Sequence, residues 1–322
     1  RKYELLPGRE TFIILDSYRE NSPVLKNSEC EVHDIGDGVL CFEFTSKSNS
    51  IGEGIGKGLN EILEIAERGE WNGLVIGNNA KQFSVGANLM FIGMLAMQKQ
   101  YKVLDKFVSD FQKINMRIRT CKIPVVVATQ GYVFGGGCEI SMHCDVGIYA
   151  AESYIGLVEV GVGLLPAGGG TKEFALRASN DFFDGDVQTP TLIKYFKSIA
   201  TAAVSTSAHE AYDLGYLNKE CDFVCVNPSM NLILAKEKVL ELSKNYMPTS
   251  YRDDVYVLGR GGVSVLYSAI NEFRMGEYMS DYDVEIARKI ANVICGGDLT
   301  SPQKVSEKYL LEIEREGFMS LL

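Results

Sequence analysis

The alternation of strand-like apolar runs with helix-period segments limits the possible folds of this chain more than any other feature. Residues 39–44 (VLCFEF) form an apolar run typical of a strand, and in residues 58–66 Leu59, Ile62, Leu63 and Ala66 share one helical face. A helix-like stretch also reaches to about residue 120. Further strand-like runs occupy residues 73–77, 124–128 and 145–150. This succession predicts an α/β protein with a layered sheet core.

The end of the chain has a different pattern. From about residue 229 we expect only helices, with amphipathic segments at 230–245 and 263–279. Ser280 at an N-cap position, with Asp283 as the acid at N3, predicts the start of another helix that stops at Gly296-Gly297. Ser301-Pro302 predicts the start of the last helix, because proline fits the first helical position.

These patterns divide the chain into three segments. Residues 1–30 mix charges, proline and asparagine without a sustained period, and the chain begins without Met, so we expect an N-terminal extension or linker at the cut end of a longer polypeptide. Residues 31–228 carry the α/β core. Residues 229–322 form a C-terminal helical region that covers the core or mediates association, which makes a homo-oligomer the expected assembly.

Charge and cysteine usage exclude several function classes. The chain has 32 Lys plus Arg against 42 Asp plus Glu, a net charge of −10 that disfavours nucleic-acid binding. It has no apolar run of membrane-spanning length and no signal-peptide core, and its eight cysteines form no paired motif. We therefore expect a soluble cytoplasmic protein. No metal is expected, because the adjacent His143, Cys144 and Asp145 cannot converge on one ion.

Glycine-rich loops are the candidate functional elements. Residues 52–58 fit neither a P-loop nor G-x-G-x-x-G, so no nucleotide cofactor is predicted. Gly135-Gly136-Gly137 follows a strand and precedes a helix carrying Glu139, so the N–H groups at the helix start can face a negative oxygen. A tight turn without chemistry is the alternative. A second loop at residues 83–88 and the acid Glu159 favour the chemical interpretation.

Four motifs in order resemble the signature of the enoyl-CoA hydratase/isomerase family, the crotonases, over roughly residues 36–246. They are Lys81-x-Phe83-x-x-Gly86-Ala87, Gly131-x-x-x-Gly135-Gly136-Gly137-Cys138-Glu139, Glu159 twenty residues later with Pro166 and a glycine run after it, and Ser207-Ala208-His209-Glu210-Ala211 with Gly215-Tyr216-Leu217. The resemblance implies a crotonase fold of repeated ββα units in a layered core. It also implies an acyl-CoA thioester substrate, with coenzyme A as part of that substrate and no separate cofactor.

Carried over residue by residue, the resemblance implies that the backbone N–H groups of Ala87 and Gly136 hold the thioester oxygen and that Glu139 and Glu159 flank the double bond. The presence of both acids favours a hydratase, because isomerases of the family often keep only one. Adding water to an α,β-unsaturated thioester needs a base, an acid and donors for the enolate-like oxygen. We predict Glu139 as the base toward water and Glu159 as the proton donor.

The resemblance also suggests a substrate-binding surface, with some departures from the family pattern. Met90 stands where a lysine that approaches coenzyme A is often found, Ala167 replaces a glycine near the catalytic water, and Asn88 and Val158 replace the usual Asp and Pro. Met90 and Met94 could line the acyl pocket or pack in the core. The predicted substrate-binding residues are Lys81, Phe83, Val85, Gly86, Met90, Met94, Gly135 and Ala167.

One stretch of this acidic chain is basic. Residues 81–122 hold eight Lys and Arg against two Asp, a local balance of +6. This stretch either attracts the phosphates of coenzyme A or is a solvated helix face.

Both ends of the chain resemble polypeptides in which a 3-hydroxyacyl-CoA dehydrogenase part precedes a hydratase part. Residues 299–301 and 307–318 carry this likeness. The expected function is hydration of trans-2-enoyl-CoA to 3-hydroxyacyl-CoA in fatty-acid β-oxidation, with a fused or associated dehydrogenase. The alternatives are an enoyl-CoA isomerase and a non-catalytic crotonase-like module of a larger enzyme.

Overall fold

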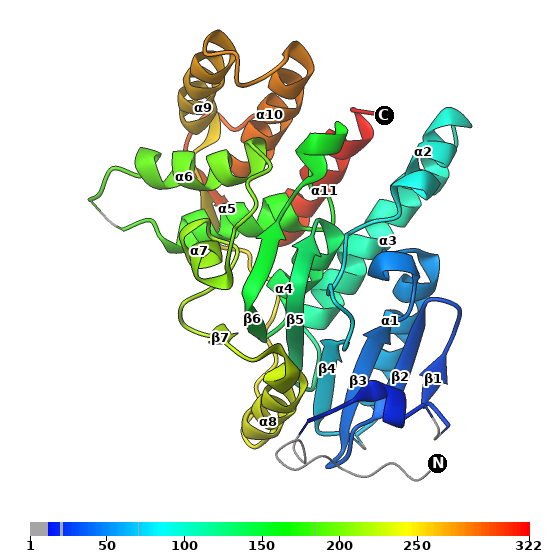
Figure 1. The fold of residues 1–322 in the computed structure, drawn as a ribbon. Helices are drawn as coiled ribbons and strands as arrows, with labels where there is room; N and C mark the ends of the chain where they lie inside the picture. Colours follow the sequence, from blue (N-terminus) through cyan, green and yellow to red (C-terminus); the bar gives the residue numbers. More distant parts are fainter. Residues whose placement is uncertain (1–11, 20–21, 70, 184) are drawn as a thin grey trace.

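The computed structural model describes residues 12–19, 22–69, 71–183 and 185–322. Its main feature is a seven-stranded sheet in sequence order, antiparallel from β1 to β3 and parallel from β3 to β7 (Figure 1). The strands are β1 Leu25–Lys26, β2 Cys30–Asp34, β3 Val39–Phe44, β4 Gly73–Gly77, β5 Val125–Phe134, β6 Val146–Gly156 and β7 Phe223–Cys225. The predicted α/β class and the strands expected near residues 39–44, 73–77, 124–128 and 145–150 are confirmed.

Helices connect and cover these strands. The single helix expected up to residue 120 is divided into two helices, α2 (Leu89–Met97) and α3 (Tyr101–Arg119), which meet at residues 98–100. The α-helices are α1 Glu53–Ala66, α2 Leu89–Met97, α3 Tyr101–Arg119, α4 Gly136–His143, α5 Gly170–Asn180, α6 Thr189–Ala200, α7 Ala208–Asp213, α8 Asn231–Ser243, α9 Gly259–Met275, α10 Asp281–Ile294 and α11 Glu307–Met319. Four short 3₁₀ turns are η1 Leu15–Ser17, η2 Lys47–Asn49, η3 Glu159–Val162 and η4 Pro228–Met230.

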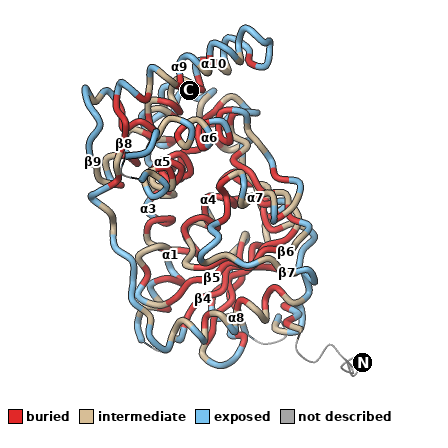
Figure 2. The backbone as a smooth tube through the Cα atoms, turned by 90° about the vertical axis from the view of Figure 1, so that its left-hand side faces the viewer, coloured by how far each residue is buried: buried red, intermediate tan, exposed pale blue. Residues whose placement is uncertain are grey.

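Both faces of the sheet are buried, which explains why its strands are apolar runs and not alternating ones. Along β3, Leu40 and Phe42 pack into the larger apolar cluster, with residues of α1 and α3. Val39 and Cys41 point to the opposite face, where residues of α8 cover the sheet. Figure 2 shows β4, β5 and β6 as a buried layer. Although α8 follows residue 229, it packs with the core sheet.

Strand β5 connects the sheet to the glycine turn. Its pairing with β6 shifts register between Thr129 and Gly131, and Gly131 has a positive φ of 58°. A side chain there would meet the backbone of Lys81, so glycine permits a close approach of the two chain segments. After the irregularity the strand continues to Phe134, beyond the predicted end at residue 128. The bend therefore delivers Gly135 and α4 to the far end of β6.

The C-terminal region differs from the expectation of helices alone. Val255–Val257 (β8) pairs antiparallel with Gln303–Val305 (β9). The last helix does not start at Ser301-Pro302, as predicted, because β9 follows the proline. Ser306 caps α11 instead, through the N–H of Tyr309.

The other helix signals in the C-terminal region are confirmed. Ser280 and Asp283 form a capping box at the start of α10. After α10, Gly296 and Gly297 have φ values of 82° and 80°, a conformation that ends a helix.

The N-terminal segment is more than a linker where it is described. Ile13 and Leu15 are buried against the apolar cluster that includes α8, and Leu25 of β1 extends the sheet. Apolar side chains at these positions explain the packing. Residues 1–11 of the predicted extension lie outside the described residues. None of the described helices combines the length and hydropathy that crossing a bilayer requires.

Candidate active site

The turn between β5 and α4 presents a backbone N–H group that has no partner within its helix. Gly135 has φ 51° and ψ −123°, a backbone conformation that favours glycine. Its own N–H donates to the carbonyl of Gly156 at 2.9 Å, which fixes the turn. Gly136 is the first residue of α4, and the N–H groups of a first helical turn have no partner within the helix. The turn therefore supplies the N–H of Gly136 as a hydrogen-bond donor.

A second loop lies against this turn. Gly86 has a φ of 90°, and a Cβ atom built on it would lie 2.9 Å from the carbonyl oxygen of Phe134 and 3.5 Å from the nitrogen of Gly136. Ile51 donates to the carbonyl of Gly86 at 2.8 Å and accepts from Asn88 at 3.0 Å, forming a bridge opposite Ala87. Neither bond uses the N–H of Ala87. The two loops thus bring the backbones around Ala87 and Gly136 together.

Two carboxyl groups, of the buried Glu139 and the partly buried Glu159, flank this junction. Glu139 is 2% exposed, and its Oε1 accepts hydrogen bonds from Gly168 at 2.7 Å and Gly170 at 2.8 Å. A Cβ atom built on Gly135 would lie 2.7 Å from Oε1 of Glu159, so Glu159 lies directly against the glycine turn. Oε2 of Glu159 is buried and has no hydrogen-bond partner among the described residues. This orphaned oxygen faces no protein donor, as expected of a group that is available to a ligand or water.

Burial makes both carboxyl groups weak acids. The pKa of Glu139 is raised to about 8, first by loss of solvent and then by the charge of Glu159, against the opposing N–H bonds of Gly170 and Gly168. The pKa of Glu159 is raised to about 7, again mainly by burial. Two interacting carboxyls with raised pKa values can divide the tasks of acid and base near neutral pH. The charge of Glu159 acts on the pKa of Glu139, so the two predicted acids lie close enough to influence each other.

The predicted substrate-binding residues separate into two groups. Gly86 and Gly135 lie at the junction of the loops, and Ala167 is buried next to the Gly168 that holds Glu139. Val85 is half-buried in the second loop. Phe83 is different, because its fully buried ring packs 5.3 Å from that of Phe44, between centroids. The motif phenylalanine is thus a core residue, and its contact with substrate stays a prediction.

The methionines Met90 and Met94 of α2 are exposed. Met90 is 85% exposed and Met94 is 44% exposed, whereas Leu95 on the same helix is buried. In Figure 1, α2 (cyan) extends away from the sheet. Packing of Met90 and Met94 in the core is therefore wrong, because only the side of α2 near Leu95 meets the core. That these exposed side chains line an acyl pocket stays a prediction.

The basic stretch is partly neutralised by ion pairs. Arg117 lies near Glu64 and Glu67, Arg119 contacts Glu173 and Glu307, and Lys113 lies 3.6 Å from Asp110. The lysines of the stretch that have no ion pair among the described residues are Lys81, Lys99, Lys102, Lys106 and Lys122. Lys81 borders a cavity of about 740 Å³ that is also lined by Tyr132 and Tyr154.

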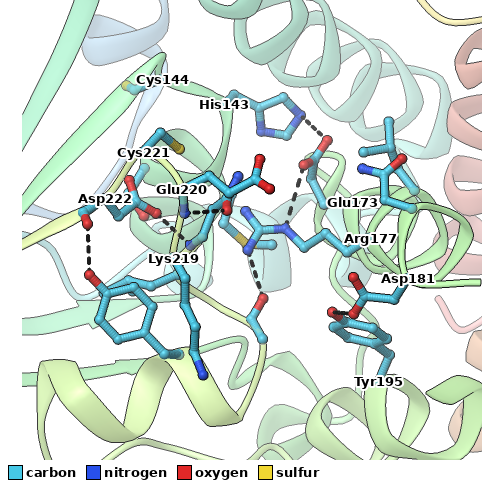
Figure 3. A pocket seen from close by; sticks show the side chains of 18 of the residues that line it. His143, Cys144, Glu173, Arg177, Asp181, Tyr195, Lys219, Glu220, Cys221 and Asp222 are labelled. Atoms are coloured by element: carbon cyan, nitrogen blue, oxygen red, sulfur yellow. Dashed lines mark hydrogen bonds and ion pairs between the residues drawn. The ribbon is translucent and has the colours of Figure 1, made fainter.

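Another cavity, of about 710 Å³, lies beside α5 and is shown in Figure 3. Its wall includes Arg177, Asp181, Tyr195 and Asp222, but neither Glu139 nor Glu159. Arg177 donates to the carbonyl of Gly215 at 2.7 Å and Tyr195 donates to Asp181 at 2.6 Å, so these groups already have partners within the protein. The candidate catalytic groups are thus not in this cavity.

One cluster has the residue types of a metal site. Glu31, His33 and Glu43 place one ligand atom each within 4.8 Å of one another. Lys26 lies 2.6 Å from Glu31, and Arg19 lies 2.8 Å from Glu43. The two cations balance the two carboxylates, so we interpret the cluster as an ion-pair network at the edge of the sheet.

His143, which we did not expect to bind a metal, is the buried last residue of α4. Its Nδ1 lies 2.6 Å from the carbonyl of Glu139. All eight cysteines are free.

The sequence patterns missed a third buried acid near the pair. Glu314 of α11 accepts from the N–H groups of Gly169 and Lys172, in the same turn that holds Glu139. No local signal marks it, because it follows an ordinary amphipathic helix pattern and its partners are more than 140 residues away in sequence.

Comparisons with known proteins indicate what this chain is similar to. Residues 34–182 match the family model described as enoyl-CoA hydratase/isomerase. The chain is 38% identical over 321 residues to a Bacillus subtilis protein named "Probable 3-hydroxyacyl-CoA dehydrogenase", covering 99% of this chain and 40% of that protein. It is 31% identical over 179 residues to the mitochondrial enoyl-CoA hydratase of Pongo abelii, covering 54% of this chain and 53% of that protein. The chain thus spans about half or less of the length of these relatives.

The fold has solved counterparts. The crystal structure of an enoyl-CoA hydratase from Bacillus anthracis aligns with a TM-score of 0.55 at 21% identity, over 82% of this chain and 89% of that one. At this identity the likeness shows the fold alone. Together with the match over residues 34–182, it means that this chain has a crotonase fold and, over that segment, the sequence pattern of the enoyl-CoA hydratase/isomerase family.

Proposed function

We propose that the chain hydrates trans-2-enoyl-CoA thioesters to 3-hydroxyacyl-CoA. One observation carries the proposal: two buried carboxyls with raised pKa values, Glu139 and Glu159, flank the junction of two loops whose Ala87 and Gly136 N–H groups are available as donors. Hydration requires that combination of acid, base and oxyanion donors in one dry space.

The proposed reaction distributes three roles over four residues. The base removes a proton from water while the water oxygen bonds to C3, and the electrons of the double bond move toward the thioester carbonyl. The N–H groups of Ala87 and Gly136 stabilise the negative charge on that oxygen. The acid then delivers a proton to C2, so that one water is added in total. We assign the base to Glu139, held by Gly168 and Gly170, and the acid to Glu159.

The name of the Bacillus subtilis relative supports a second part of the proposal. Because the chain covers only 40% of that protein, we propose that a 3-hydroxyacyl-CoA dehydrogenase part is fused to or associated with this one. Its reaction class would consume the 3-hydroxyacyl product, as expected in fatty-acid β-oxidation.

A single assay tests the reaction. The protein is mixed with short-, medium- and long-chain trans-2-enoyl-CoA, and loss of the absorbance of the conjugated thioester is followed. Turnover supports a hydratase. Conversion of 3-enoyl-CoA to 2-enoyl-CoA without hydration would indicate an isomerase, and inactivity on both substrates would favour a non-catalytic module.

The unpaired lysines give a prediction about substrate binding. We expect charge reversal of Lys99 and Lys102 to raise the apparent KM and flatten its salt dependence, because exposed cations attract the phosphates of coenzyme A through screened long-range forces. The value of kcat should change by less than about twofold, since these groups would bind ground and transition states alike. Steady-state kinetics at low and high salt measures both.

Individual variants of Lys81, Lys99, Lys102 and Lys106 locate the effect, and reversal of Lys113, which already pairs with Asp110, is the control. If no variant changes KM at low ionic strength, the basic stretch is a solvated helix face.

A further inference from the structure

Glu314 brings a buried carboxyl group from the last helix to the turn that precedes α5. Its Oε1 accepts from the N–H of Gly169 at 2.7 Å and from the side-chain amide of Gln112 at 3.0 Å. Its Oε2 accepts from the N–H of Lys172 at 2.8 Å. Three N–H groups thus donate to one fully buried carboxyl. Breaking any of these bonds would cost free energy, because water cannot reach a fully buried group to replace the lost partner, so the position of Glu314 is fixed.

Glu139 uses the alternate N–H groups of the same turn. It accepts from Gly168 and Gly170, whereas Glu314 accepts from Gly169 and Lys172. The helix α5 begins at Gly170, so these donors are ones that the helix itself leaves unsatisfied. The positive end of the helix also attracts both carboxyls. A movement of Glu314 would therefore shift the donors that hold Glu139.

A second acid on the same face of α11 anchors this contact. Glu307 lies seven residues before Glu314, two helical turns away, and its Oε1 lies 3.2 Å from Nζ of Lys172 and 3.1 Å from Arg119. Lys172 is thus held through its backbone by Glu314 and through its side chain by Glu307. Figure 1 shows α11 (red) in the middle of the molecule, and these bonds join it to α3 and α5.

We infer that Glu314 is a positioning residue for the hydration proposed above, on which this inference rests: it fixes the turn at residues 168–172 that holds Glu139 and adds a third carboxyl to the Glu139 and Glu159 pair. The C-terminal region thereby contributes directly to the geometry of the site.

The charges around these carboxyls define the expected pH effect. Glu139 of α4, Glu159 of η3 and Lys172 of α5 are the charged groups that act on this cluster, and α3 contributes the neutral Gln112. Burial and then the charge of Glu139 raise the pKa of Glu314 to about 8. Glu314 in turn acts on the raised pKa of Glu159, but its own pKa is the higher of the two, so Glu314 is largely uncharged near neutral pH. Uncharged glutamine is therefore a close mimic of Glu314 in that range.

The variants Glu314→Gln and Glu314→Ala separate charge from position. Glutamine keeps the shape and one acceptor oxygen and is uncharged like a protonated carboxyl, so we expect Glu314→Gln to keep most of the wild-type kcat and the wild-type pH–rate profile near neutral pH. Alanine releases the turn, and we expect kcat to fall about 10- to 100-fold with KM within about twofold. Glu312→Gln, an exposed acid on the same helix, is the matched control and should resemble wild type.

A measurement without turnover keeps this inference separate from the proposed function. In protein labelled with ¹³C at the glutamate carboxyls, the signal lost in Glu139→Gln identifies Glu139. Its titration midpoint should be higher in Glu314→Ala than in Glu314→Gln, because both variants lack the third carboxyl but only alanine releases the N–H donors of Gly168 and Gly170 that lower the pKa of Glu139. If wild type hydrates no enoyl-CoA, the proposed function fails while the titration still tests the contact. Equal midpoints in folded Glu314→Ala and Glu314→Gln, judged by circular dichroism, would overturn the inference.

Discussion

Replacing Glu139 or Glu159 by glutamine is expected to lower the kcat of enoyl-CoA hydration by about 10²–10⁴-fold, with little change in substrate binding. In the Glu139→Gln variant, the side-chain amide oxygen can still accept from Gly168 and Gly170, so the fold should persist. What disappears is a group that exchanges protons near neutral pH. Single-turnover and steady-state kinetics on trans-2-enoyl-CoA measure the loss.

The pH dependence gives the same prediction a second readout. The two carboxyls titrate as an interacting pair with raised pKa values of about 7 and about 8, which predicts a bell-shaped profile of kcat/KM near neutral pH, falling where both are protonated and where both are ionised. Each glutamine variant should lose one limb of that profile. Glu61→Gln, an exposed acid of α1, controls for a change of charge alone. Near-wild-type turnover in both active-site variants would refute the assignment.

The second large effect is expected at Gly136. A Cβ atom at this position would lie 3.2 Å from Cδ1 of Ile51 and 3.3 Å from Cζ of Phe111, so even alanine requires its neighbours to yield slightly. Valine adds two methyl groups to that contact and should tilt the N–H that we assign to the thioester oxygen. Loss of one oxyanion donor costs about 10²–10³-fold in kcat, and we expect Gly136→Val to be folded and slower by this amount.

The matched control is Gly261→Val in α9. Gly261 is also near the start of a helix, but a Cβ atom there meets nothing within 4 Å. Both variants undergo a similar change of helix propensity, so only Gly136→Val should lose activity. A native-like circular-dichroism spectrum with retained activity in Gly136→Val would mean that the turn is structural.

Local sequence patterns predicted the parts of the fold that depend on near neighbours. The apolar runs of β3 and β4 were recognisable because helices bury both faces of the sheet. The capping box at Ser280 and Asp283 was readable because both partners lie within one helical turn. The prediction of a helix start at Ser301-Pro302 was wrong for the same reason, because a local pattern reflects only near neighbours. Proline and serine permit a helix start there, but pairing of β9 with β8, some fifty residues earlier in sequence, takes the segment into a strand.

The sequence by itself determined the candidate chemistry: two acids, Glu139 and Glu159, at a spacing that the crotonase family shares, each following a strand of one sheet. Only the tertiary structure decided which neighbours surround them. It buried Phe83 in the core, turned Met90 toward solvent and brought Glu314 from α11 to the turn that holds Glu139. The physical reason is that periodicity and caps record contacts within a few residues, whereas burial and pKa depend on groups that are distant in sequence and are joined only by packing.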